Sequence, residues 1–69
     1  MKISSTKFNL ALAYHCMGIA DLAKMSGVSK VRLSDIKNGK AEVVRPGTIG
    51  KIAKALDVPV TDIIEMEDL

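Results

Sequence analysis

The strongest constraint on the fold comes from residues 19–38, in which two short apolar-periodic segments are separated by only a few residues. Their inward-facing positions at helical spacing are Leu22, Ala23, Leu33 and Ile36. Gly27 lies between the segments, and glycine readily adopts the positive φ with which a helix commonly ends. Ser29 is a residue type that caps the start of a helix. We therefore expect a helix over 19–25, a short turn and a second helix over 30–37.

The same periodicity predicts three further short helices. They span residues 7–15, residues 48–56 and a final segment that begins at Pro59, and Gly18 separates the first of them from the helix that begins at residue 19. Their apolar positions are Phe8, Ala11, Leu12 and His15, then Ile49, Ile52, Ala53 and Leu56, and finally Val60, Ile63 and Ile64. The pattern is typical of an all-α protein built as a compact bundle of five short helices.

Three places depart from this regular pattern. Residues 40–47 are predicted to form a loop, because Pro46 and Gly47 interrupt any regular period there. Residues 65–69 are predicted to fray, as chain ends commonly do. Gly50 lies inside the helix predicted over 48–56, where glycine costs about 1 kcal/mol relative to alanine, so we expect close packing around it.

Length and composition limit the class of protein. A chain of 69 residues has room for one domain, residues 1–69, and the core must be aliphatic because Phe8 and Tyr14 are the only aromatic residues among the 48% that are hydrophobic. The single cysteine, Cys16, excludes an internal disulfide and a cysteine-rich zinc site. The sequence has neither a signal-peptide pattern nor an apolar run long enough to span a bilayer. We expect a cytoplasmic protein that does not bind membranes.

Charge is segregated along the chain. From Lys24 to Lys54 there are eight basic and two acidic residues, whereas from Asp57 onward there are five acidic residues and no basic one. This asymmetry suits a protein that turns one face toward a polyanion and the other away from it. An unevenly charged solvated surface would give the same pattern, and charge alone leaves the two interpretations equally open.

No constellation typical of an enzyme is visible. His15 and Cys16 are neighbours, but no second histidine, third ligand or orienting acid lies at a useful spacing for a metal site or a nucleophile. A phosphate-binding glycine loop and a pair of catalytic carboxylates are also missing from the sequence. We expect no catalytic residues, no metal and no cofactor, and we interpret His15 and Cys16 as residues at the edge of the core.

Residues 21–40 (DLAKMSGVSKVRLSDIKNGK) and 49–64 (IGKIAKALDVPVTDII) carry a family resemblance. They resemble the Cro and repressor type of helix-turn-helix protein, the lambda repressor-like domain, and the resemblance covers the chain from Met17 to Ile64. It implies five short helices around one core, with the helix-turn-helix motif at residues 19–38. It also implies that the second helix of the motif, residues 29–37, enters the major groove of double-stranded DNA.

The resemblance implies that the exposed residues of this recognition helix read bases. These residues are Ser29, Lys30, Val31, Ser34 and Asp35. Lys30 can donate to guanine O6 and N7, Val31 offers an apolar surface for a thymine methyl group, and Asp35 can accept from cytosine N4. Asp35 has a simpler alternative, a local ion pair with Arg32 three residues earlier on the same helix.

Phosphate contacts are implied for a second set of residues. These are Ile19 through its backbone, Arg32, Lys37, Asn38, Lys40 and Arg45. The chain departs from the family pattern at Ile19, where family members usually have a polar glutamine or threonine that holds a phosphate. It also has Leu12 and Lys37 where the family often pairs a basic with an acidic residue, which frees Lys37 to face the DNA backbone.

The resulting functional hypothesis is a sequence-specific transcriptional regulator, a repressor that binds its operator as a homodimer and needs no small-molecule ligand. Such a protein would be associated with the nucleoid. The candidate dimer surfaces are the second apolar side of the first helix, with Leu10, Ala13 and Tyr14, and the C-terminal residues Ile63, Ile64, Met66 and Leu69. Two alternatives stay open: an antitoxin-like or anti-repressor-like module that uses the fold to hold a protein partner, and an architectural DNA binder without sequence preference.

Overall fold

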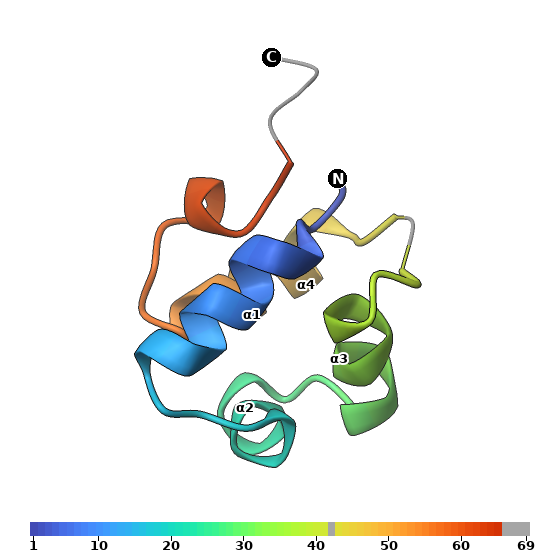
Figure 1. The fold of residues 1–69 in the computed structure, drawn as a ribbon. Coiled ribbons are helices and arrows are strands. Elements are labelled where there is room, and N and C mark those ends of the chain that lie inside the picture. Colours follow the sequence, from blue (N-terminus) through green and yellow to red (C-terminus); the bar gives the residue numbers. More distant parts are fainter. Residues whose placement is uncertain (42, 66–69) are drawn as a thin grey trace.

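The computed structural model describes residues 1–41 and 43–65, and this part of the chain is all-α (Figure 1). Its elements are α1 (Ser5–Tyr14), α2 (Ile19–Ser26), α3 (Lys30–Lys37), α4 (Pro46–Ala55) and the 3₁₀ helix η1 (Val60–Asp62). The all-α prediction is confirmed, whereas the prediction of five helices is corrected to four α-helices and one 3₁₀ turn in the described residues. The predictions made for residues 66–69, including Met66 and Leu69, fall outside them.

The last helix is short because the chain next forms a backbone pairing. Within η1, the Asp62 N–H donates to the Pro59 carbonyl at 2.9 Å. Ile64 then forms an isolated antiparallel β-bridge with Ile3, which requires extended backbone. A helix could not continue through this bridge.

Local side chains set where two of the α-helices begin. The Lys7 N–H donates to the Ser4 hydroxyl oxygen at 3.3 Å, at the start of α1. In α3, the Arg32 N–H donates to the Ser29 hydroxyl oxygen at 3.2 Å. Both contacts satisfy an N–H group that has no partner inside its helix, so Ser29 caps α3 as the sequence predicts.

The start of α4 corrects the predicted loop. Pro46 and Gly47 belong to the first turn of this helix, which begins two residues before the predicted Thr48. Proline fits the first helical position because its fixed φ is helical and because an N–H at that position would have no partner in the helix. The loop therefore ends at Arg45.

Three helices end with the same backbone turn, although only one of them uses glycine. The residues after the caps have left-handed φ angles of 51° at Cys16, 73° at Gly39 and 54° at Asp57. Residues other than glycine rarely adopt this backbone conformation. Helix α1 thus ends at Tyr14 through the left-handed Cys16, rather than through Gly18 as the sequence suggested. The bonds that close these turns are Met17 N–H to Leu12 O, Lys40 N–H to Asp35 O, and Val58 N–H to Ala53 O.

The core collects aliphatic side chains from every helix, and Phe8 is its one aromatic member. Most of the predicted core positions are buried in it, including Leu22, Leu33, Ile49, Ile52 and Leu56, each 0% exposed. Ile63 and Ile64 are also buried, at 0% and 7% exposed. Their helical spacing predicted a place in the core, which is confirmed, whereas their assignment to a dimer surface is wrong. Their side chains fill the core against the helices instead.

The first residues of the chain link two distant segments. On one side, the Val44 N–H donates to the Met1 carbonyl at 2.8 Å. On the other side, the Ser4 N–H donates to the Ile63 carbonyl at 2.8 Å. Ile3 and Val44 are therefore buried, which the helical periodicity did not predict. This pairing fixes the loop before α4, which carries two of the predicted phosphate contacts.

The structure adds two observations on sites. No helix in residues 1–41 and 43–65 is long and apolar enough to cross a membrane. Across the same described residues, His, Cys, Asp and Glu side chains do not gather in threes to form a group that could hold a metal ion. His15 is half-buried at the end of α1 and Cys16 is exposed.

Candidate nucleic-acid interface

The turn between α2 and α3 is built by its own residues. The Ser26 hydroxyl donates to the Leu22 carbonyl at 2.7 Å and accepts from the Val28 N–H at 3.2 Å. Gly27 has a φ of 76°, and its N–H donates to the Ala23 carbonyl at 3.0 Å. These three local hydrogen bonds hold the backbone of the turn between the two helices.

Helix α3 has a buried side and an exposed side. Leu33 and Ile36 are 0% and 2% exposed, and they pack in the core. The opposite side is open to solvent, and even the aliphatic Val31 is 75% exposed there. An exposed aliphatic residue among charged ones provides apolar surface where a ligand can reach it.

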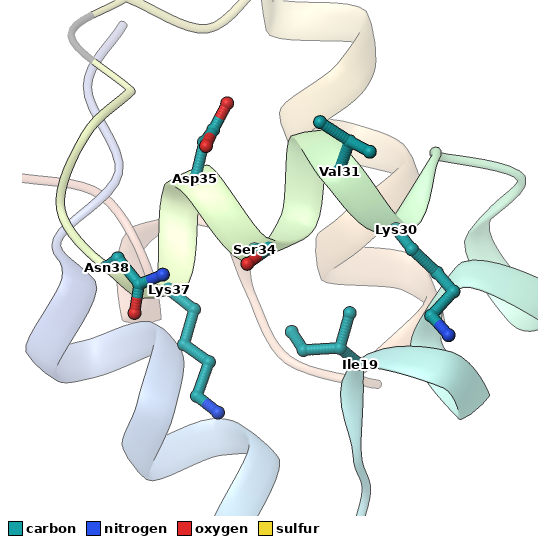
Figure 2. A pocket seen from close by; sticks show the side chains of 7 residues that line it. All are labelled: Ile19, Lys30, Val31, Ser34, Asp35, Lys37 and Asn38. Atoms are coloured by element: carbon teal, nitrogen blue, oxygen red, sulfur yellow. The ribbon is translucent and has the colours of Figure 1, made fainter.

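A surface hollow of about 480 Å³ joins this exposed side of α3 to the start of α2 (Figure 2). The residues that line it are Ile19, Lys30, Val31, Ser34, Asp35, Lys37 and Asn38. Figure 2 shows Lys30, Ser34 and Lys37 on the side of α3 that faces Ile19, and Val31 and Asp35 on the side that points away from it. The hollow thus combines two cations, one carboxylate and apolar surface.

The hollow brings together part of the predicted site. All of the residues predicted to read bases line it except Ser29, whose hydroxyl oxygen caps α3. Of the residues predicted to bind phosphate, those that line it are Ile19, Lys37 and Asn38. The other three are exposed elsewhere: Arg32 on α3, and Lys40 and Arg45 at the two ends of the loop before α4.

The charged groups of the hollow are not neutralised by one another. Within residues 1–41 and 43–65, the one ion pair joins Lys2 Nζ to Glu65 Oε2 at 3.6 Å, on another part of the molecule. The alternative interpretation of Asp35, an ion pair with Arg32, is therefore not formed in this structure. The Asp35 carboxylate and the Lys30 ammonium both remain available to a ligand.

Asn9 on α1 also holds the interface, and sequence reasoning missed it. Its side-chain amide donates to the Ser5 carbonyl at 2.9 Å and to the Lys37 carbonyl at 3.2 Å. The second bond satisfies a carbonyl at the C-terminal end of α3, where helices leave acceptors without partners. The available signal was a polar residue between the apolar positions of α1. Leu12, where the family often has a basic residue, is buried in the core, at 6% exposed.

The start of α2 carries a second residue that sequence reasoning missed. The Gly18 N–H donates to Asp21 Oδ2 at 3.2 Å, so the carboxylate caps its own helix. A negative charge in the first turn stabilises a helix through its dipole. The same charge opposes a phosphate at this helix end, where the sequence placed a backbone contact at Ile19.

Comparison with known proteins gives matches at the level of sequence. A family model described as a Cro/C1-type helix-turn-helix DNA-binding domain matches residues 7–68. The uncharacterized HTH-type transcriptional regulator YozG of Bacillus subtilis (strain 168) is 37% identical over 57 residues, which are 83% of this chain and 68% of that protein. The HTH-type transcriptional repressor RghR of the same organism is 49% identical over 41 residues, which are 59% of this chain and 30% of that protein. No solved structure matches the chain.

The sequence match and the geometry agree on the same segment. The two helices joined by the Gly27 turn lie inside the matched residues 7–68, and the exposed side of α3 has the mixture of cationic and apolar groups that DNA recognition requires. The chain therefore belongs to the family of Cro/C1-type helix-turn-helix DNA-binding domains.

Proposed function

We propose that this chain is a sequence-specific transcriptional regulator that reads its operator with α3 in the major groove. The observation that carries the proposal is the hollow along the exposed side of α3, which is lined by cationic and apolar side chains of this helix. Hydrogen bonds within the preceding turn hold the start of the helix in place. A major groove about 12 Å wide admits one α-helix. The family is a class of DNA-binding regulators rather than a class of enzymes.

Base reading is assigned to the residues of α3 that border the hollow together with Ser29 at its cap. Lys30 donates to guanine, Val31 contacts a thymine methyl group and Asp35 accepts from cytosine N4. The structure supports the assignment for Asp35 because its carboxylate has no ion pair with Arg32. Ser29 and Ser34 add hydroxyl groups that can donate or accept.

Phosphate binding is assigned to side chains on both flanks of α3. These residues are Arg32, Lys37, Asn38, Lys40 and Arg45, with a weaker contribution from the Ile19 backbone. The Ile19 contribution is weaker because the Asp21 carboxylate occupies the same helix end. The protein should thus depend on cationic side chains more than on a helix N-terminus, and its DNA affinity should fall steeply with salt.

Repression and dimerisation are further parts of the proposal. RghR, which is 49% identical over its matched 41 residues, is named a transcriptional repressor, and occupying an operator is the simplest way for a small DNA-binding domain to act. One α3 reads only a half-site. A homodimer that presents two copies about one helical turn apart would gain affinity by linking the two binding events.

The test is selection of bound sequences from a random pool of duplexes, followed by binding measurements at several salt concentrations. We expect one motif, arranged as an inverted repeat, with an affinity that decreases as salt rises. Equal affinity for unrelated duplexes would instead indicate an architectural DNA binder. Failure to bind any duplex would contradict the proposal and favour a module that holds a protein partner.

A further inference from the structure

A second hollow, of about 590 Å³, lies between α1 and the segment that follows α4. It shares no residue with the hollow along α3. Its lining includes the side chains of Lys7, Leu10, Tyr14, His15, Asp57 and Asp62. We call this surface the α1–η1 groove.

One rim of the groove is an exposed apolar side of α1. Leu10 is 64% exposed and Tyr14 is 85% exposed, and a spacing of four residues places them on the same side of the helix. Tyr14 is one of only two aromatic residues in the chain, and the other, Phe8, fills the core. A large aromatic side chain that projects this far is typical of an anchor residue at a protein–protein interface.

The groove also contains a polar atom without a partner. His15 Nε2 is buried, and nothing in the described residues forms a hydrogen bond with it. Buried polar atoms are nearly always hydrogen-bonded. Because this nitrogen has almost no accessible surface, a group that enters the groove reaches it only if the imidazole turns outward. The Tyr14 ring stands edge-on beside the imidazole, with 5.3 Å between the ring centroids.

The charges of the groove have both signs. Lys7 contributes a cation, while Asp57 and Asp62 contribute two carboxylates. The two carboxylates make the groove unsuitable for a nucleic acid, and a peptide of one charge sign would match only part of it. A surface that has an apolar projection, a hollow and both charges is complementary to a copy of itself.

We propose that the α1–η1 groove is the surface through which two copies of this chain associate, with Tyr14 of each copy inserted into the groove of the other. In this arrangement the His15 ring of one copy turns outward, and its Nε2 accepts a hydrogen bond from the Tyr14 hydroxyl of the other. The inference rests on the proposed dimeric binding of an operator, and it leaves the hollow along α3 free in both copies. It also replaces the candidate surface at Ile63 and Ile64, which is buried.

The test is sedimentation equilibrium of the full chain without DNA. We expect a reversible dimer, and we expect Tyr14→Glu to weaken it by at least about 30-fold, as for a hot-spot residue. Met25→Glu is the matched control, because Met25 is 60% exposed on α2 and lines neither hollow. The control should dimerise like the wild type. A wild type that stays monomeric, or an equal effect of both substitutions, would overturn the inference.

Tyr14→Phe tests the predicted contact with His15. This substitution keeps the ring and removes only the hydroxyl, so we expect the dimer to weaken by about 3- to 10-fold, which corresponds to one hydrogen bond. Unchanged dimerisation of Tyr14→Phe would refute the hydroxyl contact. Because Tyr14 and Met25 are largely exposed, unfolding curves of all three variants should match the wild type at protein concentrations low enough to keep every chain monomeric.

DNA binding separates this inference from the proposed function. Tyr14→Glu should bind an isolated half-site like the wild type and lose the extra affinity for an inverted repeat. If the folded variant also loses half-site binding, the groove contacts DNA and the inference is wrong. If the wild type dimerises through the groove but binds no duplex, the inference stands and the proposed function fails.

Discussion

The two sides of α3 differ in what they do for the molecule. The inner side, with Leu33 and Ile36, is buried and belongs to the core. The outer side, with Lys30, Val31 and Asp35, is exposed and borders the hollow proposed to read DNA. An eight-residue helix is marginal in water by itself, so the inner side stabilises the element that the outer side uses. Stability and recognition are thus carried by different side chains and should respond to different substitutions.

The largest effect is expected on the inner side. Leu33→Ala should lower the free energy of unfolding by about 2–5 kcal/mol, because it removes a fully buried side chain and leaves a cavity. Denaturant titration followed by circular dichroism would measure the loss. Val31→Ala is the control on the same helix, and its effect should stay within about 0.5 kcal/mol because Val31 is 75% exposed. Similar losses in both variants would contradict the division of α3 into two sides.

The outer side should show the converse behaviour. Lys30→Ala should weaken binding to the selected operator by about 1–3 kcal/mol and leave the free energy of unfolding unchanged. Fluorescence anisotropy at several salt concentrations would show whether Lys30 contacts a base or a phosphate. Loss of a base contact relaxes the preference at one position, whereas loss of a phosphate contact lowers the salt slope by about one. Lys51→Ala, on the exposed side of α4, is the control, and an equal loss there would refute the assignment.

The Asn9 amide holds the C-terminal end of α3, so its replacement should lower both the free energy of unfolding and the operator affinity. Asn9→Asp keeps the shape but removes the amide donor to Ser5 and Lys37. Two hydrogen bonds are lost, and the new carboxylate lies against two carbonyl oxygens, so we expect the free energy of unfolding to fall by about 1–3 kcal/mol. Operator affinity should fall less than in Lys30→Ala. Thermal unfolding beside the exposed-site control Thr6→Ala would show whether the bond matters, and equal stability of the two variants would argue against it.

The smallest effect is expected at Gly50 in α4, away from both sides of α3. A Cβ at this position would meet nothing within 4 Å, which corrects the predicted close packing. Gly50→Ala should therefore raise the free energy of unfolding by about 0.5–1 kcal/mol, since alanine loses less backbone freedom on folding. Operator affinity should not change. Gly27→Ala should be destabilising instead, because its φ is 76°, and a stabilised Gly27→Ala would contradict the left-handed turn.

Much of the fold could be predicted because it depends on neighbours in sequence. Ser29 caps α3, Gly27 has the expected left-handed φ and α3 spans its predicted residues. Predictions failed where a residue type had two roles. Pro46 was assigned to a loop because proline interrupts a helix, although it is also favoured at a helix start. Cys16 and Asp57 end helices in a conformation that the sequence led us to expect only at glycine.

The residues of the candidate site were also predictable only in part. The family resemblance assigned Lys30, Val31, Ser34 and Asp35 to the exposed surface of the recognition helix, and in the structure all four line one hollow. Asn9 and Asp21 were missed because their roles depend on a particular acceptor or donor, rather than on periodicity. The contacts proposed for individual bases and phosphates remain predictions that the binding measurements address.

The sequence by itself determined where the chain is helical and which side of each helix is apolar, because helical periodicity and caps act within a few residues. Only the tertiary structure decided that the first residues pair with Val44 and Ile63, and that Asn9 reaches the end of α3. These contacts join residues 28 or more positions apart, as between Asn9 and Lys37, and depend on how the helices pack together. No local pattern specifies such a distance, so the surface left for DNA and for a second copy becomes visible only in the folded chain.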